Sequence, residues 1–463
     1  MKNIIVVFSK NFRISDNQLL NYSTNQNSRL ILLYIDDPDL FKGSASNWFL
    51  HNALKSFSQD LKSKYNANLL IKKGDIVSTL QNLVKRYQVN EVVMPRSYDP
   101  KAIKKQNILK KKLPELLSDL TVINDTLLFN PEDIKNLSGS YFKVFTPFWK
   151  SCLSKIHNLS KPCPPPKSIN LINLEDSDIK NNENAIIDLN LLPKNPNWAK
   201  NWDNLYKVSE DSAHDVANNF ISSNVYDYKK NRDFPAISGT SKLSPYLNFG
   251  LISPKQIYYK LIPFIGHNSV DCFLSEIGWR EFSYNLIHNF PDLRNKNFNA
   301  KFDNFPWQEN EEHLRSWQYG NTGIAIIDAA MRQLYETGWM HNRVRMIVAS
   351  FLTKNLLIDW REGAKWFEDC LVDADLAVNS ASWQWVAGCG ADAAPYFRIF
   401  SPILQSKKFD PETKYIKNWV TELRDAKVND ILNLEKISSY MPPIVDLPSS
   451  RNKALEAYSV LKK

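Results

Sequence analysis

The sequence predicts an α/β domain with a parallel sheet, joined by a long interdomain loop to a second, all-α domain. Three observations support this division. Short β-rich runs alternate with helical stretches through the first 130 residues. Proline-rich and aperiodic polar sequence follows, and from residue 196 onward the pattern is mainly helical. We therefore assign residues 1–130, 131–195 and 196–463 to the α/β domain, the connector and the helical domain.

The first domain contains β-rich runs separated by amphipathic segments. The runs are NIIVVF, RLILLYI, NLLIKKG, EVVMPR and TVINDTLLF, and the helical segments lie near 46–65, 76–88 and 101–117. This alternation predicts a doubly wound parallel sheet, whose ligands lie beyond the carboxyl ends of the strands. Neither GxGxxG nor GxxxxGKS occurs, so the sequence does not support ordinary NAD or NTP binding.

The connector is predicted from its prolines and its lack of periodicity. The stretch SKPCPPPKS cannot continue a helix, because proline lacks an amide proton and restricts the residue before it. The stretch NLINLEDSDIKNNENAIIDLN is polar and aperiodic. We therefore expect a long interdomain loop between the two domains.

Composition restricts the classes of function. The formal net charge of +9 favours a polyanionic partner, most simply nucleic acid, although a basic surface can also serve solubility alone. The five cysteines lack CxxC spacing and the seven histidines lack HExxH, so we expect a reduced cytoplasmic protein without a metal site. No stretch is long and apolar enough to span a membrane, and the N-terminus lacks the order of a signal peptide.

The stretch DFPAISGTSKLSPYLNFG, residues 233–250, brings hydroxyl side chains to a predicted loop-to-helix junction. Thr240, Ser241 and Ser244 lie where the helix is expected to begin. Hydroxyls and free amides at such a junction suit a diphosphate. An ordinary helix cap is the alternative interpretation.

The stretch FLSEIGWREFSYNLI, residues 273–287, places Glu276, Trp279 and Arg280 on one face of a predicted helix. A carboxyl group beside an aromatic plate suits recognition of a base-like ring by stacking and an edge hydrogen bond. A surface Glu–Arg pair on an amphipathic helix is the alternative. Eleven of the thirteen tryptophans lie after residue 195, and a bulky core explains any one of them equally well.

Two further stretches combine polar side chains with buried-looking helices. In GWMHNRVRMIVASF, residues 338–351, a helix would place Asn342, Arg345 and Met346 on one face. In residues 369–402, a helix over 375–387 would align Asp375, Asn379 and Trp383. Buried carboxylates need partners, and Arg345 is a suitable one. A planar cofactor with polar edges would be a suitable third group, and a purely structural ion pair is the alternative.

These segments resemble the photolyase and cryptochrome flavoprotein family. The resemblance is carried by RDFPAISGTSKLSPYLNFG, EIGWREF, GWMHNRVRMIVASFL, LIDWREG and DADLAVNSASWQWVAGCGADAAPYFRIFSP, with FSKNFRISDN and YFKVFTPFWK nearer the N-terminus. It implies a Rossmann-like antenna domain over residues 1–130 and a helical domain that binds FAD and a DNA lesion over 196–463.

The resemblance also implies which residues bind FAD. The matching positions are Tyr228, Thr240, Ser241, Lys242, Leu243, Ser244, Phe273, Glu276, Arg280, Arg345, Asp373, Ala374, Asp375 and Asn379. Residues 240–244 match the phosphate contacts, and Asp373 and Asp375 match the acidic pair near the ribityl chain and the isoalloxazine. Arg345 matches the guanidinium that pairs with Asp373, and Asn379 matches the side chain that faces flavin N5.

Within the family, the chain looks most like a class I cyclobutane pyrimidine dimer photolyase. Such enzymes repair DNA by electron transfer from photoexcited, reduced FAD to a flipped-out dimer. The matching lesion contacts are Glu276, Trp279, Arg280, Asn342, Arg343, Met346, Trp385 and Gln405. Photolyases for (6-4) lesions carry a histidine at the position of Asn342. A cryptochrome-type blue-light photoreceptor without repair activity is the alternative.

Chemical roles follow from the same resemblance. Glu276 would donate a hydrogen bond to a thymine carbonyl, provided that an apolar pocket raises its pKa. Asn379 would favour the reduced, anionic flavin. Trp383, Trp360 and Trp307 match a relay of indoles that passes electrons from the surface to oxidised FAD.

The expected partner is UV-damaged DNA. We expect a bacterial-type, cytoplasmic monomer with no membrane association and no obligate protein partner. An antenna chromophore is less well specified, because PRSYDPKAIKK matches the folate-binding pattern poorly. Methenyltetrahydrofolate, deazaflavin, a second flavin and no antenna at all stay open.

Overall fold

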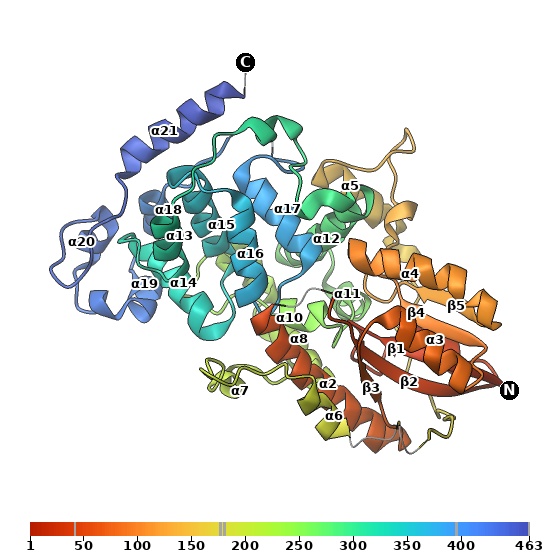
Figure 1. The fold of residues 1–463 in the computed structure, drawn as a ribbon. Helices are drawn as coiled ribbons and strands as arrows, with labels where there is room; N and C mark the ends of the chain where they lie inside the picture. Colours follow the sequence, from red (N-terminus) through yellow and green to blue (C-terminus); the bar gives the residue numbers. More distant parts are fainter. Residues whose placement is uncertain (41–42, 176–177, 179–181, 394–396, 462–463) are drawn as a thin grey trace. The chain divides into compact units, whose positions relative to one another are not determined.

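The computed structural model describes residues 1–40, 43–175, 178, 182–393 and 397–461 (Figure 1). Part of the polar connector and residues 394–396 of the predicted 369–402 stretch lie outside these ranges. The chain forms two compact units that interleave in sequence. The first unit comprises 1–135, 150–223 and 241–267, and the second comprises 136–149, 224–240 and 268–463. The boundaries of the three predicted domains stay a prediction.

The first unit contains a parallel sheet in the order β3-β2-β1-β4-β5. Its strands are β1 (Lys2–Phe8), β2 (Ser28–Asp36), β3 (Leu70–Lys73), β4 (Glu91–Pro95) and β5 (Asp119–Ile123). The predicted doubly wound sheet is confirmed. The fifth run was predicted to continue to residue 129, but the strand ends at Ile123. The side chain of Asn124 accepts hydrogen bonds from the amides of Thr126 and Leu127, which turns the chain.

Helices of the first unit cover both faces of this sheet. The helices that this unit contains are α1 (Gln18–Thr24), α2 (Ser44–Tyr65), α3 (Ile76–Arg86), α4 (Pro100–Lys112), α6 (Asn182–Asp188), α7 (Trp202–Leu205), α8 (Glu210–Ser223), α10 (Ser244–Asn248) and α11 (Pro254–Leu261). Leu80 of α3 and Leu109 of α4 pack against one face, as Figure 1 shows for these two helices. On the other face, the ring of Phe57 in α2 lies 4.8 Å from that of Phe8 in β1. The predicted helices 46–65, 76–88 and 101–117 therefore correspond to α2, α3 and α4.

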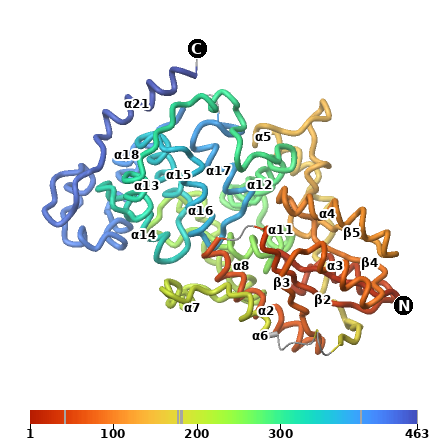
Figure 2. The backbone as a smooth tube through the Cα atoms, viewed as in Figure 1, coloured from red at the N-terminus to blue at the C-terminus, as the bar shows by residue number. Residues whose placement is uncertain are grey.

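The second unit is helical in the part that the structure describes. Its helices are α9 (Tyr228–Asn231), α12 (Asn268–Asn289), α13 (Glu311–Gln318), α14 (Ala325–Thr337), α15 (Asn342–Ser350), α16 (Trp360–Cys370), α17 (Leu376–Ala387), α18 (Pro402–Phe409), α19 (Lys414–Trp419), α20 (Val428–Asn433) and α21 (Leu447–Val460). Helices α12, α15 and α16 all pack against α17, and the backbone can be followed between them in Figure 2. Among the described residues, no helix has the length and apolar character needed to cross a membrane.

Local signals fix where the helices of the second unit start and stop. Helix α14 is followed by Gly338, which adopts the left-handed conformation with φ of 68°. The helix predicted over 338–351 begins only at Asn342, because His341 caps its first turn. The predicted connector also contains two helices, α5 (Phe145–Lys155) and α6. Helix α5 forms from the end of YFKVFTPFWK, which the connector assignment did not anticipate.

Gly250 is a position where the fold of the first unit requires a glycine. Its φ is +64°, and an added Cβ would lie 2.1 Å from the carbonyl oxygen of Lys10. Gly266 also has a positive φ, of +98°, but an added Cβ there would meet open space. Backbone strain alone costs about 1–2 kcal/mol at either position, so the steric clash separates the two.

We expect Gly250→Ala to lower the melting temperature clearly more than Gly266→Ala, the matched control. Thermal unfolding followed by circular dichroism measures the difference. Equal melting temperatures would show that the segment around Lys10 and Asn11 moves aside without cost.

Candidate functional site

An ion pair between Arg345 and Asp373 joins α15 to the segment before α17. Arg345 Nη2 lies 3.1 and 2.9 Å from the two carboxylate oxygens of Asp373, and its Nε donates to the carbonyl of Met340 at 2.8 Å. The Asp373 side chain is 3% exposed, so the pair is largely buried on the carboxylate side. The pairing that the sequence predicts is therefore present. Ala374 separates Asp373 from Asp375.

Asp375 is fixed at the start of α17 by three hydrogen bonds. Its carboxylate accepts from the amides of Ala377 and Val378 at 3.0 and 3.1 Å, and from the hydroxyl of Tyr284 in α12. The guanidinium of Arg280 lies over the Tyr284 ring, 5.0 Å from its centroid. One turn along α17, the side-chain Nδ2 of Asn379 donates to the carbonyl of Ala364 in α16 at 3.0 Å. The predicted residues Arg280, Asp375 and Asn379 thus lie where α12, α16 and α17 meet.

A chain of alternating charges connects the residues predicted to contact the lesion on α12 and α15. Glu276 forms an ion pair with Arg232, whose Nε lies 4.0 Å from the carboxylate of Asp233. That carboxylate lies 2.8 Å from Nη2 of Arg343. Glu276 and Arg343 therefore belong to one polar network. One turn further along α12, Nη1 of Arg280 lies 3.8 Å from the carboxylate of Glu281.

The pairing of Glu276 bears on its predicted role as a hydrogen-bond donor. In this structure its carboxyl accepts from Arg232. Burial works to lower the pKa of the Arg232 guanidinium, but the hydrogen bond and charge of Glu276 outweigh burial and raise that pKa. Arg232 is thus held as a cation between Glu276 and the ring of Tyr228, whose centroid is 5.2 Å away. Burial, and then the charge of Glu276, raise the pKa of the Tyr228 phenol.

Two other side chains of the predicted set adjoin this network. The ring of Phe273 meets that of Tyr228 edge to face, at 5.2 Å. Met346 lies one turn after Asn342 on α15, with its sulfur 3.8 Å from Nη1 of Arg343. Asn342 itself is exposed at the start of the helix. Asn342, Arg343 and Met346 therefore lie within the first turns of α15, with the thioether beside the guanidinium of Arg343.

Trp279 is stacked on an aromatic side chain that the sequence analysis did not consider. The ring of Phe145 lies 3.9 Å from the indole, with an angle of 8° between the planes. The amide of Phe145 donates to the carboxylate of Asp392 at 3.3 Å. Close packing of α5 on α12 is possible because Gly278 has no side chain, and an added Cβ would lie 2.6 Å from Trp149. One face of the Trp279 indole is therefore covered by protein.

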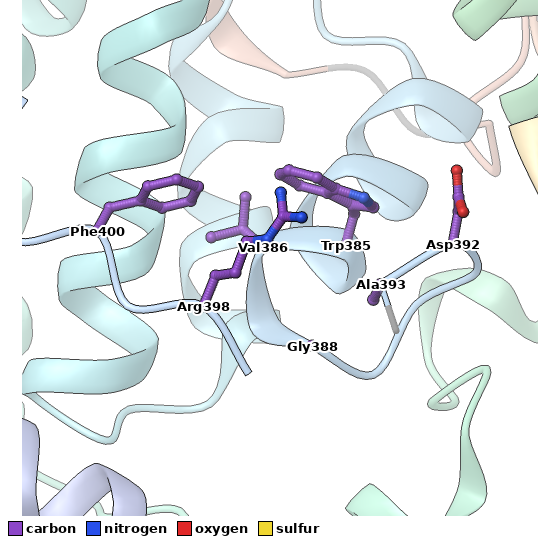
Figure 3. Close-up of a pocket in the computed structure, with 7 residues that line it drawn as sticks. All are labelled: Trp385, Val386, Gly388, Asp392, Ala393, Arg398 and Phe400. Atoms are coloured by element: carbon purple, nitrogen blue, oxygen red, sulfur yellow. The ribbon is translucent and has the colours of Figure 1, made fainter. Parts of the chain in front are cut away.

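A pocket of the second unit lies beside Trp385 (Figure 3). It is lined by Trp385, Val386, Gly388, Asp392, Ala393, Arg398 and Phe400. The guanidinium of the exposed residue Arg398 points toward the indole (Figure 3). Glu276 and Asn342 do not line this pocket, so it accounts for only one of the predicted lesion contacts. Gln405, another predicted contact, lies on α18 with a buried amide oxygen that has no hydrogen bond within the described protein.

The three indoles of the predicted relay lie on segments that hydrogen bonds tie together. Trp360 is fully buried, Trp383 is 2% exposed and Trp307 is half-buried. The amide of Gln308, next to Trp307, donates to the carbonyl of Leu357 at 2.8 Å, shortly before Trp360. Gly363 allows Trp383 to lie against α16, since an added Cβ would be 2.1 Å from its ring.

The predicted phosphate-binding residues fall on both sides of a unit boundary. Thr240 belongs to the second unit, whereas Ser241, Lys242, Leu243 and Ser244 belong to the first. Ser241 is half-buried, Ser244 is exposed, and Lys242 adopts a left-handed conformation with φ of 53°. Leu243 precedes α10 and makes no side-chain cap bond, but its amide donates to the hydroxyl of Ser241 at 3.3 Å, so the alternative of a hydroxyl cap stays open.

His341 stands at the centre of the charged network and was not among the predicted site residues. It is 2% exposed, and its Nδ1 accepts from the amide of Arg343 at 3.1 Å. A ring nitrogen that accepts carries no proton, so the neutral ring is protonated at Nε2. Burial above all lowers the pKa of His341 to about 4. Arg345, Arg343 and Arg232 act in the same direction, and Asp233 opposes them.

Sequence analysis also missed Arg232, Phe145 and Arg398. Arg232 lies at the start of RDFPAISG, and Phe145 lies in YFKVFTPFWK. Both were therefore within quoted motifs, although neither was given a role. Arg398 also lies within a quoted motif, DADLAVNSASWQWVAGCGADAAPYFRIFSP, and its position beside Trp385 is seen only in the structure (Figure 3).

Comparisons with known proteins agree on one family over the length of the chain. Residues 4–167 match the family described as DNA photolyase, and residues 273–460 match the FAD binding domain of DNA photolyase. The deoxyribodipyrimidine photo-lyase of Agrobacterium fabrum is 40% identical over 99% of this chain and 98% of its own. The crystal structure of a bacterial class III photolyase from Agrobacterium tumefaciens is 39% identical, with a TM-score of 0.93, over 100% of this chain and 98% of its own. Cryptochrome-2 of Arabidopsis thaliana is 32% identical over 99% of this chain and 79% of its own.

The lowered pKa of His341 predicts how the stability of the protein depends on pH. Its pKa is 6.5 in an ordinary environment and about 4 here, so between these values the unfolded chain binds a proton that the folded chain does not. Stability should therefore fall as the pH drops from 6.5 to 4, by up to about 3 kcal/mol from this group alone.

We expect His341→Asn, which keeps a capping side chain, to gain melting temperature relative to the wild type as the pH falls through this window. His157→Asn, at an exposed histidine, is the control and should follow the wild type. Parallel curves for His341→Asn and the wild type would contradict the assignment.

Proposed function

Because this chain belongs to the photolyase and cryptochrome family, we propose that it repairs cyclobutane pyrimidine dimers in DNA in a light-driven reaction, with FAD as its cofactor. The observation that carries this proposal is the 40% identity to a deoxyribodipyrimidine photo-lyase over nearly the full length of both chains. The match of residues 273–460 to the FAD binding domain of DNA photolyase supports the cofactor.

The side chains of the site are chemically suited to FAD. The amides at the start of α10 lack a side-chain cap, and Thr240, Ser241 and Ser244 beside them would hold the diphosphate. Asp373 and Asp375, fixed by Arg345 and by the α17 amides, would accept hydrogen bonds from the sugar-like chain. Reduced FAD held by these residues would supply the light-excited electron donor that the ring-opening of the dimer requires.

The remaining cofactor residues would position the flavin. The side-chain Nδ2 of Asn379 is held by its bond to the carbonyl of Ala364, and its oxygen would be the group available to the flavin. Tyr228 and Phe273, packed edge to face, would contribute an apolar wall. Lys242, Leu243, Ala374, Arg280 and Glu276 complete the set that the sequence predicts.

The charged network would receive the lesion. A flipped-out dimer presents carbonyl groups and flanking phosphates, which suit the guanidinium groups of Arg343 and Arg232. Glu276 would contact a thymine carbonyl as a donor only after it gives up the hydrogen bond from Arg232. Trp279, Asn342, Met346, Trp385 and Gln405 would supply stacking, amide and apolar contacts. The formal charge of +9 makes binding to the DNA backbone dependent on salt.

Narrower parts of the proposal have less support. The assignment to class I stays a prediction, and the likeness to a class III photolyase favours that group instead. We also propose a cytoplasmic monomer without an obligate protein partner, and leave the antenna chromophore open. A cryptochrome-type photoreceptor is the second candidate, since Cryptochrome-2 is 32% identical. That relative is matched over a smaller share of its length than the photo-lyase is, which favours repair.

We expect the purified protein with reduced FAD to restore a thymine-dimer oligonucleotide in blue light and not in darkness. Glu276→Ala should lower the repair yield about tenfold, the loss expected for one hydrogen bond to developing charge, and leave FAD bound. Glu311→Ala, at an exposed carboxylate, is the control. No repair by the illuminated wild type would favour the photoreceptor, and full repair by Glu276→Ala would remove the role of that carboxyl.

We expect Trp360→Phe to slow photoreduction of oxidised FAD by at least tenfold, because the middle carrier of the relay is lost. Repair by chemically reduced enzyme should be unaffected. Trp202→Phe removes another buried indole, in the first unit, and should photoreduce at the wild-type rate. Absorption spectra recorded during illumination with a thiol reductant measure the rates. Equal rates for both variants would count against the relay.

A further inference from the structure

The indole N–H of Trp360 donates a hydrogen bond to the side-chain oxygen of Asn297, at 2.9 Å. Trp360 has no exposed surface and Asn297 is 4% exposed, so water does not compete for this bond. Asn297 lies in the segment between η6 (Pro291–Arg294) and η7 (Ala300–Asn304). The predicted relay includes Trp360 but gives no role to Asn297.

A carboxylate stands behind the amide of Asn297. Its Nδ2 donates to Asp303 at 2.6 Å, and Asp303 is exposed at the surface. An indole N–H, an amide and a carboxylate therefore form a continuous chain from the core to solvent. A charged acceptor polarises the amide, which makes its oxygen a stronger acceptor for the indole N–H.

Hydrogen bonds join the segment that contains Asn297 to α17, the helix that carries Trp383. Gln384, the next residue of α17, donates from its side chain to the carbonyls of Leu293 and Lys296 at 2.6 and 2.9 Å. Its side-chain oxygen accepts from the amide of Phe298 at 2.8 Å. Asn297 is thus held between α17 and Trp360, with little freedom to turn away.

The positive charge of Arg361 affects how easily Trp360 loses an electron. The guanidinium of Arg361 lies 4.9 Å from the indole ring and is bonded to Asp359 at 2.7 Å. A cation over the ring favours the electron-rich neutral indole and opposes the loss of an electron. The oxygen of Asn297 at the ring edge favours that loss, because the N–H becomes more positive when an electron leaves.

We propose that Asn297 is a positioning residue of the electron relay, and that its oxygen, backed by Asp303, stabilises Trp360 in the oxidised, still protonated form. The inference rests on the proposed function, which places Trp360 in the relay. An indole that has lost an electron is strongly acidic at its N–H. An amide oxygen accepts that hydrogen bond but is too weak a base to keep the proton, so Trp360 stays protonated.

The relay balances with one electron at each step. Trp360 gives an electron to oxidised Trp383, Trp307 gives one to oxidised Trp360, and an external dithiol such as dithiothreitol gives one to Trp307. Two such electrons and two protons leave the dithiol as it closes to a disulfide. No covalent bond of Trp360 forms or breaks.

The hydrogen bond itself can be tested without any light reaction. In protein labelled with ¹⁵N-tryptophan, the indole N–H signal of Trp360 is identified by its loss in Trp360→Phe. Asn297→Leu has a side chain of similar size without an acceptor. We expect its Trp360 N–H signal to shift upfield and to exchange with solvent faster than in the wild type.

The consequence for the relay is measured by photoreduction of oxidised FAD in blue light with dithiothreitol. We expect Asn297→Leu to slow photoreduction at least fivefold and Asp303→Asn to slow it by a smaller factor. Repair by chemically reduced enzyme should be unchanged in both. Asp292→Asn, which removes an exposed carboxylate from the neighbouring η6, is the matched control and should keep the wild-type rate.

The outcomes separate this inference from the proposed relay. If Trp360→Phe slows photoreduction but Asn297→Leu, with its hydrogen bond lost, keeps the wild-type rate, Asn297 has no such role and the relay stands. If Trp360→Phe keeps the wild-type rate, the relay fails and the inference fails with it. Should Asn297→Leu not fold, Asp303→Asn decides, and a rate equal to that of Asp292→Asn overturns the inference.

Discussion

The ion pair between Arg345 and Asp373 is the contact on which the candidate site depends. It joins α15, which carries Asn342, Arg343 and Met346, to the segment before α17. The Asp373 side chain is almost fully buried, and removal of one partner from a buried ion pair typically costs about 3–5 kcal/mol. The amide of Val372 also donates to the carbonyl of Gly338 at 2.8 Å, which fixes the same two segments. The pair therefore sets the register between the predicted lesion face and the predicted cofactor face.

In the rest of the site, too, buried and half-buried charges have partners of opposite charge or hydrogen-bond donors. Glu276, Arg232, Asp233 and Arg343 alternate in sign, so each half-buried charge has a neighbour of the opposite sign. Asp375 is held by amides and a hydroxyl instead of a cation. His341 lies among three guanidinium groups and stays neutral, because burial and their charges lower its pKa to about 4. These arrangements give a polar site with paired charges, which suits the proposed positioning of a cofactor and a flipped-out pyrimidine dimer.

Much of this architecture could be read from local patterns. The parallel sheet follows from strand–helix alternation, and α15 and α17 follow from helical spacing. The Arg345–Asp373 pair was expected from the family resemblance, whereas the argument that a buried carboxylate needs a partner concerned Asp375, which amides and a hydroxyl hold instead. Local patterns did not anticipate partners that are distant in sequence. Glu276 pairs with Arg232, and Trp279 stacks on Phe145 from the predicted connector. The end of strand β5 and the start of helix α15 were misjudged by a few residues, because the side chains of Asn124 and His341, not apolar periodicity, set these boundaries.

The sequence by itself determined the fold class and the family, because these depend on spacing along single elements and on long motifs. It also indicated many polar residues of the site, although not Arg232 or His341. Only the tertiary structure decided which of those residues meet. Asn297 shows the reason: nothing in NKNFNAKF marks it, and its bond to Trp360 exists because Gln384 fastens that segment to α17. Hydrogen bonds and ion pairs require contact within a few ångströms, and packing between helices far apart in the chain sets those contacts.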